Sequence, residues 1–178
     1  MNKALFLDRD GIINVDHGYV YQQQDFEFTE GIFELCQHAT KLGYLLIVIT
    51  NQSGIARGKY TEADFLTLTE WMKTTFNQHN CLITDVFFCP HHPTKGKGEY
   101  LKTCQCRKPE PGLILQAATK YNIDLSQSVF IGDKVSDMQA AESAGINNRI
   151  LVASQYNDSS LETARSITEI ADARAFIV

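Results

Sequence analysis

Two aspartates stand close together near the start of this 178-residue sequence, in the segment FLDRDGIIN. Asp8 and Asp10 follow a short apolar run, and Gly11 behind them lets the backbone bend close to a ligand. Mg²⁺ prefers oxygen ligands from carboxylates, backbone carbonyls and phosphate groups. The pair therefore indicates a magnesium site, although Asp and Gly are also common in ordinary solvated turns.

Two later segments carry further polar groups directly after apolar runs. Asp133 and Asp137 lie in GDKVSDMQAAESAG, where carboxylates could bind a cation or simply cap a helix and face solvent. Thr50 and Asn51 lie in ITNQSG, where a hydroxyl or a backbone N–H could hold a phosphoryl oxygen. An ordinary turn after a strand remains the alternative for these two residues.

A lysine precedes two prolines in the segment RKPEPG. Pro109 disfavours the helical conformation at Lys108, and Pro111 suits the first turn of a helix. The pattern therefore predicts that Lys108 lies just ahead of a helix N-terminus, which itself favours anions. A solvated loop lysine is the alternative interpretation.

Three of the five cysteines form a cluster with histidine. Cys89-x-His91 and Cys104-x-Cys106 are matched pairs, and three thiolates with one imidazole make the closed ligand set of a structural zinc site. His92 could replace His91, but the matched spacing favours His91. A disulfide or redox pair would leave an odd cysteine, and a metal-free loop is the other alternative. Four protein ligands leave no open position, so we expect the zinc to be structural.

Apolar runs and helical patterns alternate along the chain. TEGIFELCQHATKLG places Thr29 as a helix N-cap and Gly43 just past the helix end, and Thr61 with Asp64 has capping-box spacing. The segment from residue 160 onwards is predicted to be helical with a short strand. We expect strands at 4–7, 44–50, 85–89, 128–133 and 149–153, and helices at 29–43, 61–76, 111–121 and 136–145.

This alternation predicts an α/β fold with a doubly wound, Rossmann-like parallel sheet. In such sheets ligands bind outside the carboxyl ends of the strands. Asp8, Asp10, Thr50, Asn51 and Asp133 all fall directly after predicted strands. The polar residues should therefore meet at one edge of the sheet.

Composition limits the class of protein. Hydrophobic residues make up 44% and charged residues 21%, as in ordinary globular proteins, and we expect one domain over 1–178. The net charge of −5 disfavours a nucleic-acid-binding protein. The longest apolar run, YLLIVI, is too short to cross a membrane, and the N-terminus has no apolar signal core. We expect a soluble, cytoplasmic monomer.

Four segments together resemble the haloacid dehalogenase superfamily of phosphotransferases. The superfamily's Asp-x-Asp-Gly motif is matched at residues 8–11, its strand-ending Thr or Ser at Thr50, and its lysine before a helix at Lys108. Its acidic Gly-Asp-x-x-x-Asp motif is matched from Gly132 to Asp137. Order and spacing agree along nearly the whole chain, apart from about the last 25 residues.

The resemblance implies a two-step mechanism. Asp8 would attack phosphorus and become an aspartyl phosphate, and Asp10 would act as proton donor and then acceptor. Thr50 and Lys108 would stabilise the phosphoryl group. Mg²⁺ would be held by Asp8, Asp133 and the backbone carbonyl of Asp10. The role of Asp137 remains open between metal ligand and support.

Within the superfamily, a zinc loop such as 89–108 marks a branch without a large cap domain. The long span before Cys104 is similar to phosphatases that act on heptose bisphosphates, and histidinol-phosphate phosphatases have a shorter loop. The heptose branch removes a 7-phosphate before nucleotide activation of the sugar, as in lipopolysaccharide biosynthesis. The substrate contacts that this resemblance implies are Asp16, His17, Gly18, Tyr19, Asn51, Ser53, Arg57, Arg107 and Lys134.

Two other classes of protein share some of these features. A receiver domain is also phosphorylated on aspartate near a lysine, but it needs neither a second carboxylate in the position of Asp10 nor a zinc loop. A zinc-dependent nucleic-acid binder is supported only by the lysines of that loop, and it lacks a finger-type histidine pair. A small sugar phosphate is therefore the expected partner, with neither nucleic acid nor a membrane involved.

Overall fold

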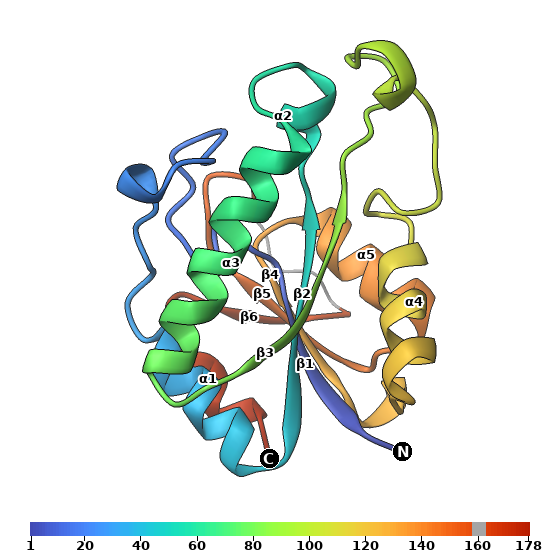
Figure 1. Ribbon diagram of the computed structural model, residues 1–178. Helices are drawn as coiled ribbons and strands as arrows, with labels where there is room; N and C mark the ends of the chain where they lie inside the picture. Colours follow the sequence, from blue (N-terminus) through green and yellow to red (C-terminus); the bar gives the residue numbers. More distant parts are fainter. Residues whose placement is uncertain (158–162) are drawn as a thin grey trace.

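The computed structural model describes residues 1–157 and 163–178 (Figure 1). Its centre is a sheet of parallel strands in the order β3-β2-β1-β4-β5-β6, which confirms the predicted doubly wound architecture. The strand order reverses between β1 and β4, so a ligand-binding crevice is expected at their carboxyl ends. The strands are β1 Lys3–Leu7, β2 Tyr44–Asn51, β3 Ile83–Cys89, β4 Val129–Gly132, β5 Asn148–Val152 and β6 Arg165–Ile167.

Helices cover both faces of the sheet. Figure 1 shows α1 and α3 on one side and α4 and α5 on the other. The α-helices are α1 Ile32–Lys41, α2 Ser53–Ala56, α3 Glu62–Gln78, α4 Gly112–Tyr121 and α5 Val135–Ala144. Short 3-10 helices are η1 Gln23–Asp25, η2 Gly98–Tyr100, η3 Leu125–Gln127 and η4 Ile170–Phe176.

Strand β1 shows why both faces are apolar. Leu5 and Leu7 pack into the core beneath α1 and α3, whereas Ala4 and Phe6 pack into the core beneath α4 and α5. Successive strand residues point to opposite faces, so a continuous apolar run is needed where both faces are covered. Burying each large side chain contributes roughly 1.5–3 kcal/mol. The central strand therefore holds Asp8 at a rigid position.

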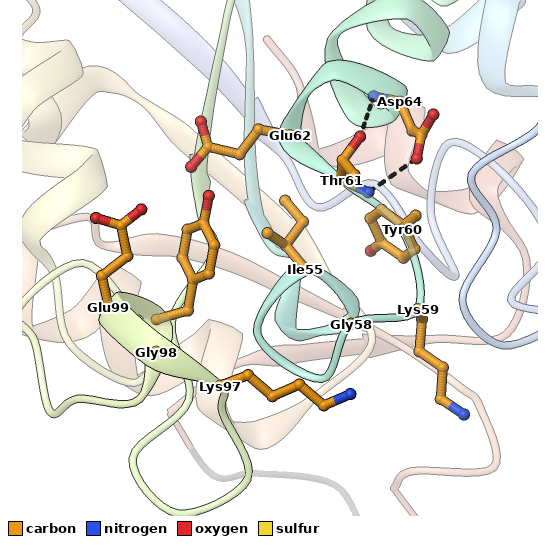
Figure 2. Close-up of a pocket in the computed structure, with 11 residues that line it drawn as sticks. Ile55, Gly58, Lys59, Tyr60, Thr61, Glu62, Asp64, Lys97, Gly98 and Glu99 are labelled. Carbon is orange, nitrogen blue, oxygen red and sulfur yellow. Dashed lines mark hydrogen bonds between the residues drawn. The ribbon is translucent and has the colours of Figure 1, made fainter.

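The predicted capping box of α3 is confirmed. Thr61 accepts a hydrogen bond from the backbone of Asp64, and the Asp64 carboxylate accepts one from the backbone of Thr61 (Figure 2). The prediction for α1 was wrong at its start, because Gly31 rather than Thr29 precedes the helix. The Thr29 hydroxyl instead donates to the carbonyl of Ile12, which ties it to the loop after β1.

The C-terminal region is less helical than predicted. It forms the short strand β6 and the 3-10 helix η4, and residues 160–162 of the predicted segment lie outside the described residues. Helices long and apolar enough to cross a membrane are absent from the described parts of the chain.

Candidate active site

Three buried carboxylates meet at the point where the strand order reverses. Asp8 follows β1, Asp133 follows β4, and Asp137 lies in the first turn of α5. One oxygen from each lies within 4.8 Å of the others. Gly11 makes this approach possible, because a Cβ there would lie 2.2 Å from Asp133 Oδ2 and its φ is +93°.

The charge of this cluster suits a divalent cation. Both carboxylate oxygens of Asp133 are buried and have no hydrogen-bond partner among the described residues. Burial, together with the charges of Asp8 and Asp137, raises the pKa of Asp133 to about 8. Burial and the Asp137 charge also raise the pKa of Asp8 to about 6. A cation bound to these oxygens would relieve both effects, and oxygen donors of this kind fit Mg²⁺.

Lys108 lies against the same carboxylates. Its Nζ atom is 2.9 Å from Asp8 Oδ1 and 2.7 Å from Asp137 Oδ1, and it donates to the Ile49 carbonyl at 2.8 Å. Although burial opposes the charged form, the carboxylates of Asp137 and Asp8 hold the pKa of Lys108 above its usual range. The Asn51 side chain pairs with both the N–H and the carbonyl of Lys108, at 3.0 and 3.1 Å. The lysine is therefore charged and fixed in position.

Asp137 connects the lysine to the loop that carries Asp133. Besides its contact with Lys108, it accepts hydrogen bonds from the backbone N–H groups of Asp133 and Lys134 at 3.2 and 3.1 Å. Gly132 leaves room for it, since a Cβ there would lie 2.5 Å from Asp137. Asp137 therefore joins Lys108 to the loop after β4, and one of its oxygens lies within 4.8 Å of oxygens of Asp8 and Asp133.

Asp10 points to a different set of partners. It accepts hydrogen bonds from Arg9, Asn14 and Gln52, and its side chain is 19% exposed. Burial opposes ionisation, but the Arg9 charge and these hydrogen bonds hold the pKa of Asp10 below its usual range. Asp10 is therefore ionised and can accept a proton.

A cavity of about 260 Å³ opens at Asp10. Most of the predicted substrate residues line it, namely Asp16, Gly18, Tyr19, Asn51, Ser53 and Lys134. His17 lies elsewhere, at the exposed surface, with its Nε2 2.8 Å from a Glu27 oxygen. Tyr156, which the sequence did not single out, also lines this cavity and donates to Asp16 at 2.9 Å.

Arg57 and Arg107 lie outside the lining of this cavity. Burial and then the charges of Arg107 and Arg57 lower the pKa of His92, which stands near the start of the cysteine loop. Arg57 Nε and Arg107 Nη1 are buried without a hydrogen-bond partner among the described residues. Unpaired buried donors of this kind suit an anionic group.

The predicted zinc ligands come together. The sulfur atoms of Cys89, Cys104 and Cys106 lie 2.9–3.5 Å apart, and His91 Nδ1 lies 3.3 Å from Cys106 Sγ. Tetrahedral zinc–thiolate bonds of about 2.3 Å place sulfur atoms about 3.8 Å apart, which is somewhat wider than this spacing. The four ligand atoms nevertheless all lie within 4.8 Å of one another, so this Cys₃His cluster could bind zinc. His92 is not a member of this cluster, and its Nδ1 accepts hydrogen bonds from the backbone N–H groups of Thr94 and Lys95.

A larger cavity, of about 810 Å³, lies between the cysteine loop and the turn before α3. Lys97 and Glu99 come from the loop, and Lys59 and Glu62 from the opposite side (Figure 2). Its lining contains neither Asp10 nor Lys134, whereas the smaller cavity is lined by both. Asp10 lies two residues after Asp8 and Lys134 directly follows Asp133, so the smaller cavity is the one next to the carboxylate cluster.

Comparisons with known proteins identify the family of this chain. A HAD-hydrolase-like family model matches residues 105–173. The chain is 48% identical over 175 residues to the D-glycero-beta-D-manno-heptose-1,7-bisphosphate 7-phosphatase of Vibrio cholerae, covering 98% of this chain and 89% of that protein. The chain belongs to this family of heptose bisphosphate phosphatases.

Solved structures support the same family. D,D-heptose 1,7-bisphosphate phosphatase from B. bronchiseptica, complexed with magnesium and phosphate, superposes with a TM-score of 0.83 at 29% identity, covering 98% of this chain and 97% of that one. A putative HAD-like phosphatase from Mesorhizobium loti gives a TM-score of 0.89 at 30% identity, covering 99% of this chain and 86% of that one.

Sequence reasoning missed the residues that hold Asp10 in this family member. Gln52 Nε2 donates to Asp10 Oδ2 at 3.1 Å and to Thr50 Oγ1 at 2.9 Å. The Tyr60 hydroxyl donates to Gln52 Oε1, which fixes the orientation of the amide. Gly54 makes room for the Tyr60 ring, since a Cβ would lie 2.2 Å from it. Gln52 stands within the segment ITNQSG, but nothing there pointed to its partners.

Proposed function

We propose that this protein is a Mg²⁺-dependent phosphatase that removes the 7-phosphate of D-glycero-β-D-manno-heptose 1,7-bisphosphate. The main supporting observation is that Asp8, at the carboxyl end of β1, lies 2.9 Å from Lys108 Nζ and within 4.8 Å of an oxygen of Asp133. The Asp133 carboxylate has no hydrogen-bond partner among the described residues. The β anomer follows the names of the relatives that are 48% identical. The 1-phosphate would remain on the product for nucleotide activation.

Asp8 is the proposed nucleophile. One of its oxygens forms a bond to phosphorus while the bond from phosphorus to the sugar oxygen breaks, which gives an aspartyl phosphate. Water then attacks that phosphorus and releases inorganic phosphate and the free carboxylate. Lys108 fits the phosphoryl-stabilising role because it is buried, charged and 2.9 Å from Asp8.

The main barrier is repulsion between a carboxylate and a phosphate dianion. Two like unit charges 4 Å apart repel by about 4 kcal/mol at an effective dielectric of 20. Mg²⁺ held by Asp8, Asp133 and the Asp10 carbonyl would offset much of this repulsion and orient the phosphoryl group. Lys108 and Lys134 supply further positive charge, and Thr50 lies near the carboxyl end of β2.

Asp10 is the proposed acid and base. Its ionised resting state suits it to take a proton from the attacking water in the second step. In the first step the leaving alkoxide needs a proton, and the negative charge of a bound phosphate favours the protonated form of Asp10. Its place at the cavity beside Asp16 and Tyr19 puts it next to the proposed sugar contacts.

Arg57 and Arg107 are the proposed contacts for the second phosphate of a bisphosphate. A guanidinium fork matches phosphate oxygens, and both side chains carry a buried donor without a partner in the described residues. Cys106 directly precedes Arg107, so zinc bound at the cysteine cluster would fix this part of the loop.

Phosphate release from a panel of substrates tests the proposal. The panel holds both anomers of the heptose 1,7-bisphosphate, other sugar bisphosphates and histidinol phosphate, each assayed with Mg²⁺. We expect the highest kcat/KM for the β anomer, with the product keeping its 1-phosphate by phosphorus NMR. Faster turnover of histidinol phosphate would refute the heptose assignment, and a stable phosphoenzyme without phosphate release would indicate a receiver-like function.

A further inference from the structure

Arg9 is a buried arginine that none of the phosphatase motifs explains. Only 2% of its surface is exposed, and it stands first among the largest fully buried side chains. Arginine is almost never fully buried unless it is paired. Its partner is Asp10, to which it donates from Nη2 at 2.8 Å and from Nε at 3.3 Å.

Both of these bonds reach the same carboxylate oxygen. Asp10 Oδ1 accepts from Arg9 and also from Asn14 Nδ2 at 3.1 Å. Asp10 Oδ2 accepts only from Gln52 among the described residues, at 3.1 Å. A carboxylate oxygen offers about two lone pairs, so Oδ1 is filled whereas Oδ2 keeps room for a proton.

The guanidinium is itself held firmly. Its Nη2 also donates to the Val20 carbonyl at 2.7 Å, and the Phe26 and Phe65 rings lie 5.8 Å from its central carbon. Val20 directly follows the proposed substrate contacts from Asp16 to Tyr19. Arg9 therefore connects Asp10 to the loop that would bind the sugar.

We propose that Arg9 is a positioning residue for phosphate transfer, which occupies Asp10 Oδ1 and so makes Oδ2 the oxygen that exchanges the proton. This inference rests on the proposed phosphatase function. In the first step Asp8 bonds to phosphorus, the bond to the leaving oxygen breaks, and that oxygen takes the proton from Oδ2. A lysine could keep the charge at this position but not the planar fork, so it would not hold the carboxylate at the same angle.

A series of aryl phosphates with leaving groups from 4-nitrophenol to phenol tests the role. Nitrophenolate departs without a proton, whereas phenolate and alkoxides gain from a positioned acid, which contributes about 10²–10⁴-fold. The quantity measured is kcat/KM, which ends with departure of the leaving group and excludes the later hydrolysis step. For Arg9→Lys we expect a loss of less than about 5-fold on nitrophenyl phosphate and of about 10²-fold on phenyl phosphate.

Arg149→Lys is the matched control. Arg149 is also buried and bonds to the carbonyls of Ile146 and Thr163, with Glu142 3.2 Å away, so it has similar chemistry at a different place. Arg149→Lys should lower the unfolding temperature. The dependence of its kcat/KM on the leaving group should be the same as in the wild type. When Asp10→Asn is already present, adding Arg9→Lys should not make kcat/KM depend more steeply on the leaving group.

If Arg9→Lys lowered kcat/KM by the same factor for every aryl phosphate, the inference would be overturned and Arg9 would be a structural residue. If that variant does not fold, Asn14→Ala removes the other donor to Oδ1, and the same steepening is expected from it. An unchanged dependence in Asn14→Ala would then overturn the inference. A wild-type protein that cleaves none of these phosphates or sugar phosphates would refute the proposed function itself.

Discussion

Replacing Asp133 by asparagine should stabilise the Mg²⁺-free protein while abolishing its response to Mg²⁺. Asparagine has nearly the same shape as a protonated aspartate but never carries the charge. In the absence of a cation, burial and the neighbouring carboxylates raise the pKa of Asp133 from 3.8 to about 8. The folded wild type therefore has to keep a proton at neutral pH that the unfolded chain releases.

The size of the effect follows from linkage between protonation and folding. Each pH unit between the unfolded-state pKa of 3.8 and the ambient pH costs about 1.4 kcal/mol. The cost is absent below pH 3.8, grows to about 1.6 kcal/mol at pH 5 and reaches about 4 kcal/mol at pH 7. Stability of the Mg²⁺-free wild type should therefore fall as pH rises from 4 to 8, and Asp133→Asn should lose less.

Urea unfolding of both proteins at pH 5, 6, 7 and 8 measures this difference. The buffers omit Mg²⁺ and also omit chelators, so that the cysteine cluster keeps its zinc. Added Mg²⁺ at 100 times its Kd should stabilise the wild type by about 2.7 kcal/mol and leave the variant nearly unchanged. The reasoning fails if the variant is no more stable than the wild type at pH 8, or if the gap between them does not grow with pH.

Four further outcomes are expected. Asp8→Asn should lower turnover by about 10³-fold or more with an unchanged circular dichroism spectrum, and near-wild-type activity would disprove the nucleophile assignment. Arg107→Ala should raise KM about 10- to 100-fold for the bisphosphate and far less for nitrophenyl phosphate, because it removes a charge-assisted contact to the second phosphate. Cys104→Ser and Cys106→Ser should each lose bound zinc by metal analysis and unfold at lower temperature; unchanged metal content, stability and activity would refute the zinc loop. Asp137→Asn should cost about 3 kcal/mol in urea unfolding, because it removes one of the two carboxylates beside buried Lys108, and an unchanged midpoint would contradict this.

Local sequence patterns predicted much of the fold. Apolar runs such as YLLIVI predicted the buried strands, because a strand covered on both faces must be apolar at every position. Thr61 and Asp64 predicted the start of α3 because their hydrogen bonds lie within one turn. Thr29 misled, since its hydroxyl bonds to Ile12, 17 residues earlier, and no local spacing encodes that partner.

The same distinction between local patterns and long-range contacts applies to the residues of the site. The carboxylates and the lysine could be placed because each follows a strand, and the sheet brings strand ends together. Arg9, Gln52 and Tyr60 could not, because their roles depend on contacts between different loops. Arg9 in particular looks like an exposed charge in the sequence, yet it is buried 2.8 Å from Asp10.

The cysteine cluster also affects which sequence changes can accumulate in this family during evolution. With zinc bound, Cys89 at the end of β3 and Cys104 would be held together by the metal, so the two ends of the loop between them would be fixed. Insertions or deletions inside that loop would alter the surface beside the larger cavity without moving Lys108. Each doubling of loop length costs only about 0.6 kcal/mol of closure entropy. Selection can therefore reshape the rim of the site through loop length while the phosphate chemistry stays constant.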